Sequence, residues 1–137
     1  MLRGTTEIRV RYAETDMMGI AYHGSYLPWL EIGRTELLRA HGLPYAELER
    51  LGYRLPVIDV ALKYLRPALY DDVIRIESTM REKPLVRLRI DYELFRGETL
   101  IARGHTSHAF LDRENQPIRP PAVFMDAVKR WFAGNAG

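Results

Sequence analysis

A short segment near the N-terminus brings together residue types that could attack or polarise a carbonyl group. Asp16 lies in a loop-like stretch, and His23 and Gly24 follow it where a helical pattern begins. The first N–H groups of a helix have no partner within it and can stabilise a developing oxyanion, while a nearby carboxylate can act as nucleophile or base. Gly19 and Gly24 would let the backbone approach a ligand closely. An aspartate before a helix is more commonly a turn or cap residue, so the pattern alone leaves both roles open.

The other polar residues give little support to metal, serine or nucleotide chemistry. His105 and His108 lie in a predicted strand at a spacing that points their side chains to opposite faces, and the chain has no cysteine. We therefore expect no metal site and no cofactor. Ser25 lies close to His23, but the chain lacks a G-x-S-x-G motif, and Ser25 suits the N-cap of the following helix. The chain also lacks a P-loop and a G-x-G-x-x-G motif.

The composition is that of an ordinary globular protein. The chain has 137 residues, of which 47% are hydrophobic and 28% charged, so we expect a single domain over residues 1–137. Its 20 basic and 18 acidic residues nearly balance, which argues against a bulk nucleic-acid binder. No apolar run is long enough to span a membrane, and the first residues do not resemble a signal peptide. We therefore expect a cytoplasmic protein without nucleic-acid or membrane partners.

The hydrophobic pattern predicts one strand, a long helix and then several strands. Residues 5–12 alternate, with Ile8, Val10 and Tyr12 directed toward one face. Residues 25–40 carry a wide apolar stripe at helical spacing, and Gly33 within it would allow another backbone to come close. The further elements that we predict are helices over 45–51 and 122–132 and strands over 55–65, 72–81, 85–95 and 99–112.

This order of elements predicts an α+β fold. Strands that follow one another without intervening helices favour an antiparallel sheet, and a helix that is apolar around most of its circumference could be wrapped by it. A turn at Gly97-Glu98 would join the last two strands as a hairpin. Five strands around one helix leave edges that a second copy can cover, so we predict a homo-oligomer, at least a dimer.

Two motifs in the chain match the pattern of a known enzyme family. The segment YAETDMMGIAYHGSYLPWLE, residues 12–31, is similar to the frame [YF]-x-[ED]-T-D-x-x-G-[IV]-x-Y-H-x-x-Y, and residues 64–78 are similar to F-x-x-P-A-x-Y-D-D. Over residues 5–132 the chain thereby resembles the 4-hydroxybenzoyl-CoA thioesterase family, and within it the YbgC-like acyl-CoA thioesterases. It departs from the family at Met17-Met18, where small residues are common, and at Lys83-Pro84, which replaces a more polar turn.

The resemblance implies the hot-dog fold, in which a curved antiparallel sheet of about five strands wraps around one long central helix. It implies dimers that join their sheets, usually paired into tetramers, with active sites at the subunit interface. For acyl-CoA thioester hydrolysis, it assigns the role of nucleophile or general base to Asp16. It assigns the oxyanion hole to the backbone N–H of His23, with Gly24 as a second candidate. It implies no cofactor and no metal.

Candidate substrate contacts and two alternatives complete the prediction. The candidate substrate-binding residues are Gly19, Tyr22, Gly24, Tyr26, Trp29, Lys83, Arg87 and Arg89. The three aromatic side chains suit the core equally well, and the three basic ones could meet CoA phosphates or only face solvent. One alternative places the catalytic base at Glu31 on the helix. The other is a non-catalytic module that binds acyl-CoA or acyl-carrier protein.

Overall fold

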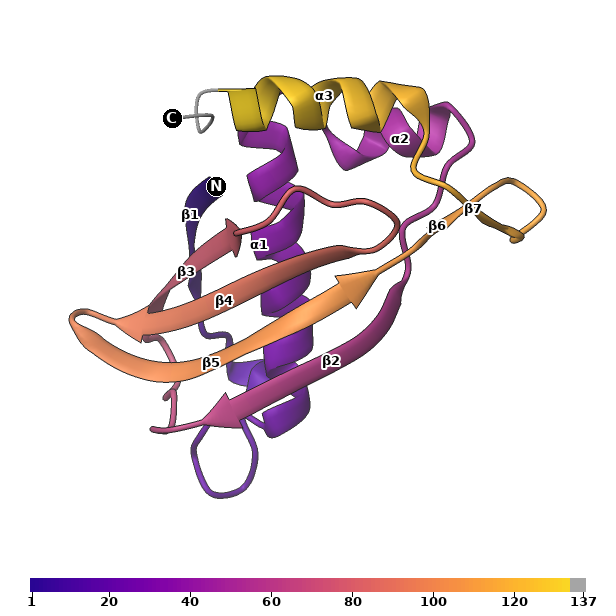
Figure 1. Cartoon of the computed structure of the whole chain (residues 1–137). Helices are drawn as coiled ribbons and strands as arrows, with labels where there is room; N and C mark the ends of the chain where they lie inside the picture. Colours follow the sequence, from indigo (N-terminus) through magenta and orange to yellow (C-terminus); the bar gives the residue numbers. More distant parts are fainter. Residues whose placement is uncertain (134–137) are drawn as a thin grey trace.

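A five-stranded antiparallel sheet curves around one long helix (Figure 1). A computed structural model describes residues 1–133, and the last four residues of the predicted domain lie outside this range. The strands have the order β1-β3-β4-β5-β2, which confirms the predicted α+β hot-dog architecture. In chain order the elements are β1 (Leu2–Arg9), the 3₁₀ turns η1 (Tyr12–Glu14) and η2 (His23–Ser25), α1 (Tyr26–Ala40), α2 (Tyr45–Arg50), β2 (Val57–Tyr64), β3 (Val73–Met80), β4 (Leu88–Arg96), β5 (Thr99–His108), β6 (Phe110–Leu111), β7 (Pro117–Ile118) and α3 (Ala122–Ala133).

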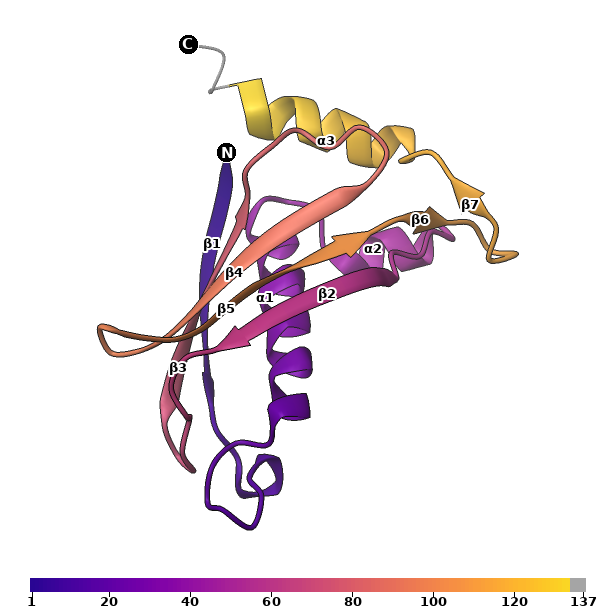
Figure 2. The same cartoon turned by 60° about the horizontal axis from the view of Figure 1, so that its bottom comes forward.

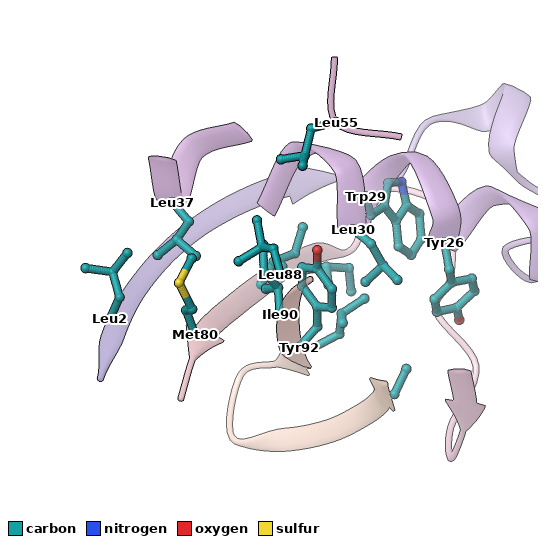
Figure 3. Packing of buried hydrophobic residues seen from close by; sticks show 14 of the residues in the cluster. Leu2, Tyr26, Trp29, Leu30, Leu37, Leu55, Met80, Leu88, Ile90 and Tyr92 are labelled. Carbon is teal, nitrogen blue, oxygen red and sulfur yellow. The ribbon is translucent and has the colours of Figure 1, made fainter. Parts of the chain in front are cut away.

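The core lies between α1 and the concave face of the sheet (Figure 3). Trp29, Leu30 and Leu37 of α1 are buried, and they face side chains such as Ile90 and Tyr92 of β4. Alternate residues of β3 and β4 are buried, as expected for strands with one face toward a core. The helix is not enclosed on all sides, because its opposite face still exposes apolar side chains to solvent. These exposed apolar residues are Leu27 and Ile32.

Gly33 lets α1 lie directly on β3. A Cβ atom at this position would come within 2.6 Å of Ser78 Oγ and 2.9 Å of Ile76 Cγ2. The close neighbours are therefore side chains of the sheet and not, as the sequence suggested, another backbone. Both atoms are only one bond beyond a strand Cβ, so little movement is available to relieve the contact.

We expect Gly33→Ala to destabilise the protein despite the better helix propensity of alanine. Overpacking costs roughly 1–3 kcal/mol, and the propensity gain offsets about 1 kcal/mol of it. Urea unfolding at a fixed protein concentration would measure the difference. In a Ser78→Ala background the penalty should shrink, since the nearest clashing atom is gone. An unchanged penalty in that background would contradict the contact as its cause.

Three side chains lie differently from the sequence prediction. Tyr12 is 80% exposed, because β1 ends at Arg9 and the chain turns into η1 before this residue. Val86 is also exposed, because β4 begins only at Leu88. Ser25 does not cap α1, because its backbone is already helical (φ −67°, ψ −20°) and its side chain accepts no helix N–H; its hydroxyl donates to the Glu14 carbonyl oxygen at 3.0 Å.

α2 and α3 lie across the C-terminal end of α1, opposite the loop that carries Asp16 (Figure 1). The indole N–H of Trp131 in α3 donates to the His41 carbonyl oxygen at 2.8 Å, and Phe124 packs on Phe110 of β6. In the described part of the chain, no helix combines the length and apolarity that a membrane span requires.

β2 forms one edge of the five-stranded sheet (Figure 2). Among the described strands it pairs only with β5, so its other side presents backbone groups that bond to no strand within residues 1–133. Nearly all of its residues are exposed, including Val57, Ile58, Val60 and Tyr64. An exposed apolar edge of this length is a site for pairing with another strand.

Candidate active site

The loop between η1 and η2 holds Asp16 in a tight turn. Its backbone N–H donates to the Ile20 carbonyl oxygen at 2.9 Å, and its own carbonyl accepts from Gly19 N–H at 3.0 Å. Gly19 has φ +79°, a conformation that glycine adopts without strain. Asp16 Oδ1 accepts from Met18 N–H at 2.8 Å, whereas Oδ2 has no hydrogen-bond partner within residues 1–133. The carboxylate therefore stabilises the turn with one oxygen and leaves the other available.

Glu14 anchors this loop to the central helix. One of its carboxylate oxygens accepts from Arg11 N–H and the other from the Trp29 indole N–H, both at 2.8 Å. Its carbonyl oxygen accepts from Tyr22 N–H and from the Ser25 hydroxyl. Burial alone would raise the pKa of Glu14, but these donors and the charge of Arg11 together lower it. Glu14 is thus ionised near neutral pH, and it ties both ends of the loop to α1.

Sequence reasoning did not single out Glu14. Glu14 occupies the acidic position of the family motif, two residues before Asp16, and this position was the one sequence feature that could have drawn attention to it. The pairing with Trp29 could not be read from spacing alone, because the partners are 15 residues apart across a loop.

The N-terminus of the helical segment faces the same region as Asp16. η2 runs directly into α1, and the N–H groups of His23 and Gly24 have no acceptor within residues 1–133. The Tyr64 hydroxyl donates to the His23 carbonyl oxygen at 2.8 Å and so links this turn to β2. Two free N–H groups at a helix start form a site for negative charge.

An open groove of about 390 Å³ joins the carboxylate and the helix start. Asp16 and His23 lie along it, together with Tyr26, Tyr64 and Arg66. The rings of Tyr26 and Tyr64 are perpendicular, with centroids 4.9 Å apart, and burial raises the pKa of both phenols. The groove thus combines neutral aromatic walls with one carboxylate and one arginine.

The other predicted contacts near this loop lie outside the groove. Trp29 is buried in the core, where it holds Glu14. The Tyr22 ring is half-exposed and lies against the His23 ring at a tilt of 45°, and Gly24 makes room for it, since a Cβ there would approach the Tyr22 ring within 2.8 Å. Gly19 serves the turn at the tip of the loop.

The predicted phosphate-binding residues lie at the other end of the molecule. Lys83, Arg87 and Arg89 follow β3, whose last residue, Met80, pairs with Leu2 near the C-terminal end of α1. Since α1 has 15 residues, this end is roughly 22 Å from the helix N-terminus. Arg89 pairs with Asp91 at 3.1 Å, and the other two side chains are exposed. One copy of the chain does not bring these residues together with Asp16.

A second cavity of about 540 Å³ lies between α1, α2, β2 and β5. Glu31, the alternative base, lines this cavity and not the groove of Asp16. At its base, Arg34 Nη1 donates to the Leu55 carbonyl oxygen at 2.9 Å and lies 3.1 Å from His108 Nδ1. His108 Nε2 continues this chain to Thr106 Oγ1 at 2.7 Å, and Thr106 to the Tyr92 hydroxyl at 2.8 Å.

The imidazole of His108 is kept neutral in this buried network. Burial, assisted by the charge of Arg34, lowers the pKa of His108 to about 4. Burial likewise raises the pKa of Tyr92 to about 12. At neutral pH, Arg34 is therefore the charged member of this chain of four side chains.

We expect His108 to make the folded protein sensitive to mild acid. An unfolded histidine binds a proton near pH 6.5, whereas the folded one resists until about pH 4. Stability should therefore be complete above pH 6.5 and fall by about 3 kcal/mol toward pH 4, where it levels off. Urea unfolding across this range would show the slope. The variant His108→Gln, which can still accept from Arg34, should lack it, and an equal slope in that variant would refute the assignment.

Within residues 1–133, His, Asp and Glu side chains do not gather in groups of three or more that could hold a metal ion. The groove of Asp16 is lined by a carboxylate and by the start of the helical segment, where N–H groups are unbonded within residues 1–133. This arrangement suits acyl transfer, in which a nucleophile or base acts on a carbonyl whose oxygen becomes negative.

Comparison with known proteins identifies the family. The model of the thioesterase-like superfamily matches residues 10–132. The chain belongs to this superfamily. Within it, the chain is 36% identical over 123 residues to "Putative acyl-CoA thioesterase YneP" of Bacillus subtilis (strain 168), covering 88% of each protein. It is 35% identical over 82 residues to the acyl-CoA thioester hydrolase YbgC of Escherichia coli O6:H1, covering 58% of this chain and 61% of YbgC.

A solved thioesterase structure shares the fold of this chain over nearly its whole length. The DHNA-CoA thioesterase from Staphylococcus aureus superimposes with a TM-score of 0.91 at 30% identity, covering 98% of this chain and 94% of that protein. The family resemblance carried by the two sequence motifs is thereby confirmed.

Proposed function

We propose that this protein hydrolyses acyl-CoA thioesters to a free acid and CoA. The observation that carries this proposal is the groove lined by Asp16, which has an available carboxylate oxygen, and by His23, whose N–H at the helix start is unbonded within residues 1–133. The activity named for YneP and for the staphylococcal enzyme supports the choice of a CoA thioester as substrate.

The proposed reaction uses the N–H groups at the helix start and the carboxylate of Asp16. The carbonyl oxygen of the thioester would accept from His23 N–H, with Gly24 N–H as a second donor, so that negative charge grows against the helix start. Asp16 then acts in one of two ways. It attacks the carbonyl carbon, expels the CoA thiolate and forms a mixed anhydride that water opens, or it deprotonates a water molecule that attacks directly. Each route consumes one water molecule and yields one acid and one thiol.

We propose further that a second copy completes the site through β2. The Tyr64 end of this strand lines the groove of Asp16, whereas Val57 and Val60 line the second cavity. Antiparallel pairing of two β2 strands about their middle would set Tyr64 of one copy near Val57 of the other. The groove of one copy would then open toward the second cavity of its partner. Two such dimers can associate into the tetramer that the family resemblance implies.

Release of free thiol from aryl, short-chain and long-chain acyl-CoA substrates tests the activity. We expect turnover of at least one substrate class, lost in the Asp16→Asn protein. Saturable binding of acyl-CoA without thiol release would contradict catalysis and indicate the non-catalytic binding module instead.

A further inference from the structure

The base of the second cavity holds a cation without a carboxylate partner. Arg34 is only 6% exposed, and within residues 1–133 no acidic side chain forms an ion pair with it. Its Nη1 is satisfied by Leu55 and His108, and the Tyr45 ring lies 5.0 Å from the guanidinium carbon. The buried Nε has no hydrogen-bond partner, and Nη2 donates to no group in this part of the chain. Burying a charge in this way is costly unless something compensates it.

The rest of the network adds a further unused donor. A guanidinium can only donate, so His108 Nδ1 accepts from Arg34, and the neutral imidazole carries its hydrogen on Nε2. That hydrogen is donated to Thr106 Oγ1. Thr106 and Tyr92 share one hydrogen bond between two hydroxyls, which leaves one O–H unused whichever of them donates. The base of the cavity therefore offers surplus donors and a positive charge.

Apolar side chains form the walls of this cavity, and the acidic residues that line it are exposed to solvent. Leu27, Val57 and Val60 line it, while the acidic side chains of its lining, Glu31 and Glu49, are exposed. A ligand that matches both regions has a hydrocarbon body and an anionic oxygen group at its far end. A carboxylate meets this description, because it accepts two hydrogen bonds in the plane of a guanidinium.

We propose that this cavity selects acyl groups that end in a carboxylate, with Arg34 as the residue that determines the preference. The inference rests on the proposed function, in which the thioester reacts at Asp16 of one copy while its acyl chain enters the second cavity of the partner. The carboxylate compensates the buried guanidinium, and a methyl terminus of the same chain leaves it uncompensated. Discrimination of this kind is strong, since a buried charged donor without its acceptor is penalised.

Two thioesters with the same carbon backbone test the preference. Adipyl-CoA ends in a carboxylate and hexanoyl-CoA in a methyl group, and kcat/KM for each gives a selectivity ratio. We expect the native protein to favour adipyl-CoA by roughly 10- to 100-fold, the usual worth of a charge-assisted hydrogen bond. Arg34→Met, which keeps the length of the side chain, should lower this ratio at least tenfold. Arg39→Met, an exposed arginine of the same helix, should keep it.

The results distinguish a role of Arg34 in substrate selection from a purely structural role. A native ratio near one overturns the proposal, and this measurement needs no variant to fold. An equal loss on both substrates in Arg34→Met also overturns it, since a purely structural arginine would affect both alike. If neither thioester is hydrolysed, equilibrium binding of the two thioesters to the native protein still gives the ratio. Equal dissociation constants in that measurement would overturn the proposal independently. The proposed function itself fails only if the aryl, short-chain and long-chain acyl-CoA substrates also release no thiol.

Discussion

Replacing Asp16 by asparagine should lower kcat by roughly 10²- to 10⁴-fold while the fold and assembly stay intact. Asparagine retains an oxygen that can accept from Met18 N–H, the one hydrogen bond that Asp16 Oδ1 makes. The turn should therefore survive, and only the charge and basicity of the side chain are lost. Thiol release gives kcat, and circular dichroism with size-exclusion chromatography shows whether the structure persists.

The matched control is Glu31→Gln. Glu31 lines the second cavity and not the groove of Asp16, so we expect this variant to keep far more of the native kcat than Asp16→Asn does. A folded Asp16→Asn protein with normal kcat, beside an inactive Glu31→Gln protein, would move the base to the helix. Normal turnover in both variants would show that Asp16 only stabilises the turn and that neither acid is the catalytic base.

Replacing Ile58 by lysine should dissociate the homo-oligomer and, as a consequence, abolish thioesterase activity. Ile58 lies on the exposed apolar edge strand β2 and is 43% exposed in a single chain. In the proposed pairing, which sets Tyr64 of one copy near Val57 of the other, position 58 lies opposite Lys63 of the second copy, so the substitution places two positive charges against each other. Because like charges facing each other cost several kcal/mol, the dissociation constant should rise roughly 100-fold or more. Light scattering would follow the native oligomer toward the 15.9 kDa monomer.

Leu85→Lys provides a control for the β2 substitution. Leu85 is a more exposed apolar residue in the loop between β3 and β4, and a lysine there should leave mass and kcat/KM unchanged. If Ile58→Lys produces a monomer that keeps full activity, a single copy suffices for catalysis and the composite site is wrong. A native protein that is itself monomeric at micromolar concentration would exclude the assembly altogether.

Local patterns in the sequence were sufficient to predict the elements that position the site. Alternation in β4 and helical spacing in α1 report which face is buried, because side-chain direction repeats with period two in a strand and 3.6 in a helix. The boundaries were less well determined. Val86 continues the alternation of β4 by residue type, but the strand starts at Leu88 because no partner strand extends that far.

The loop of Asp16 shows both the reach of sequence reasoning and its limit. Glycine at position 19 and the acid at position 16 indicated a turn before a helix, and both take part in that turn. Ser25 was predicted as a helix cap, yet its side chain accepts no N–H of α1, and its hydroxyl donates to the carbonyl of Glu14, eleven residues earlier. Capping preferences describe an isolated helix end, whereas here a neighbouring turn competes for the same hydroxyl.

What the sequence determined by itself is therefore local: the strands, the central helix, the turn at Asp16 and the motifs that indicate the family. What only the tertiary structure decided is which distant residues meet. In the sequence, Arg34 looks like an ordinary polar residue of a helix. In the structure it is buried beside His108, which lies 74 residues away on β5 and contacts its guanidinium. Lys83 and Arg87 read as phosphate ligands, but the sheet carries them to the opposite end from Asp16. Chain folding sets such distances, and no local periodicity encodes them.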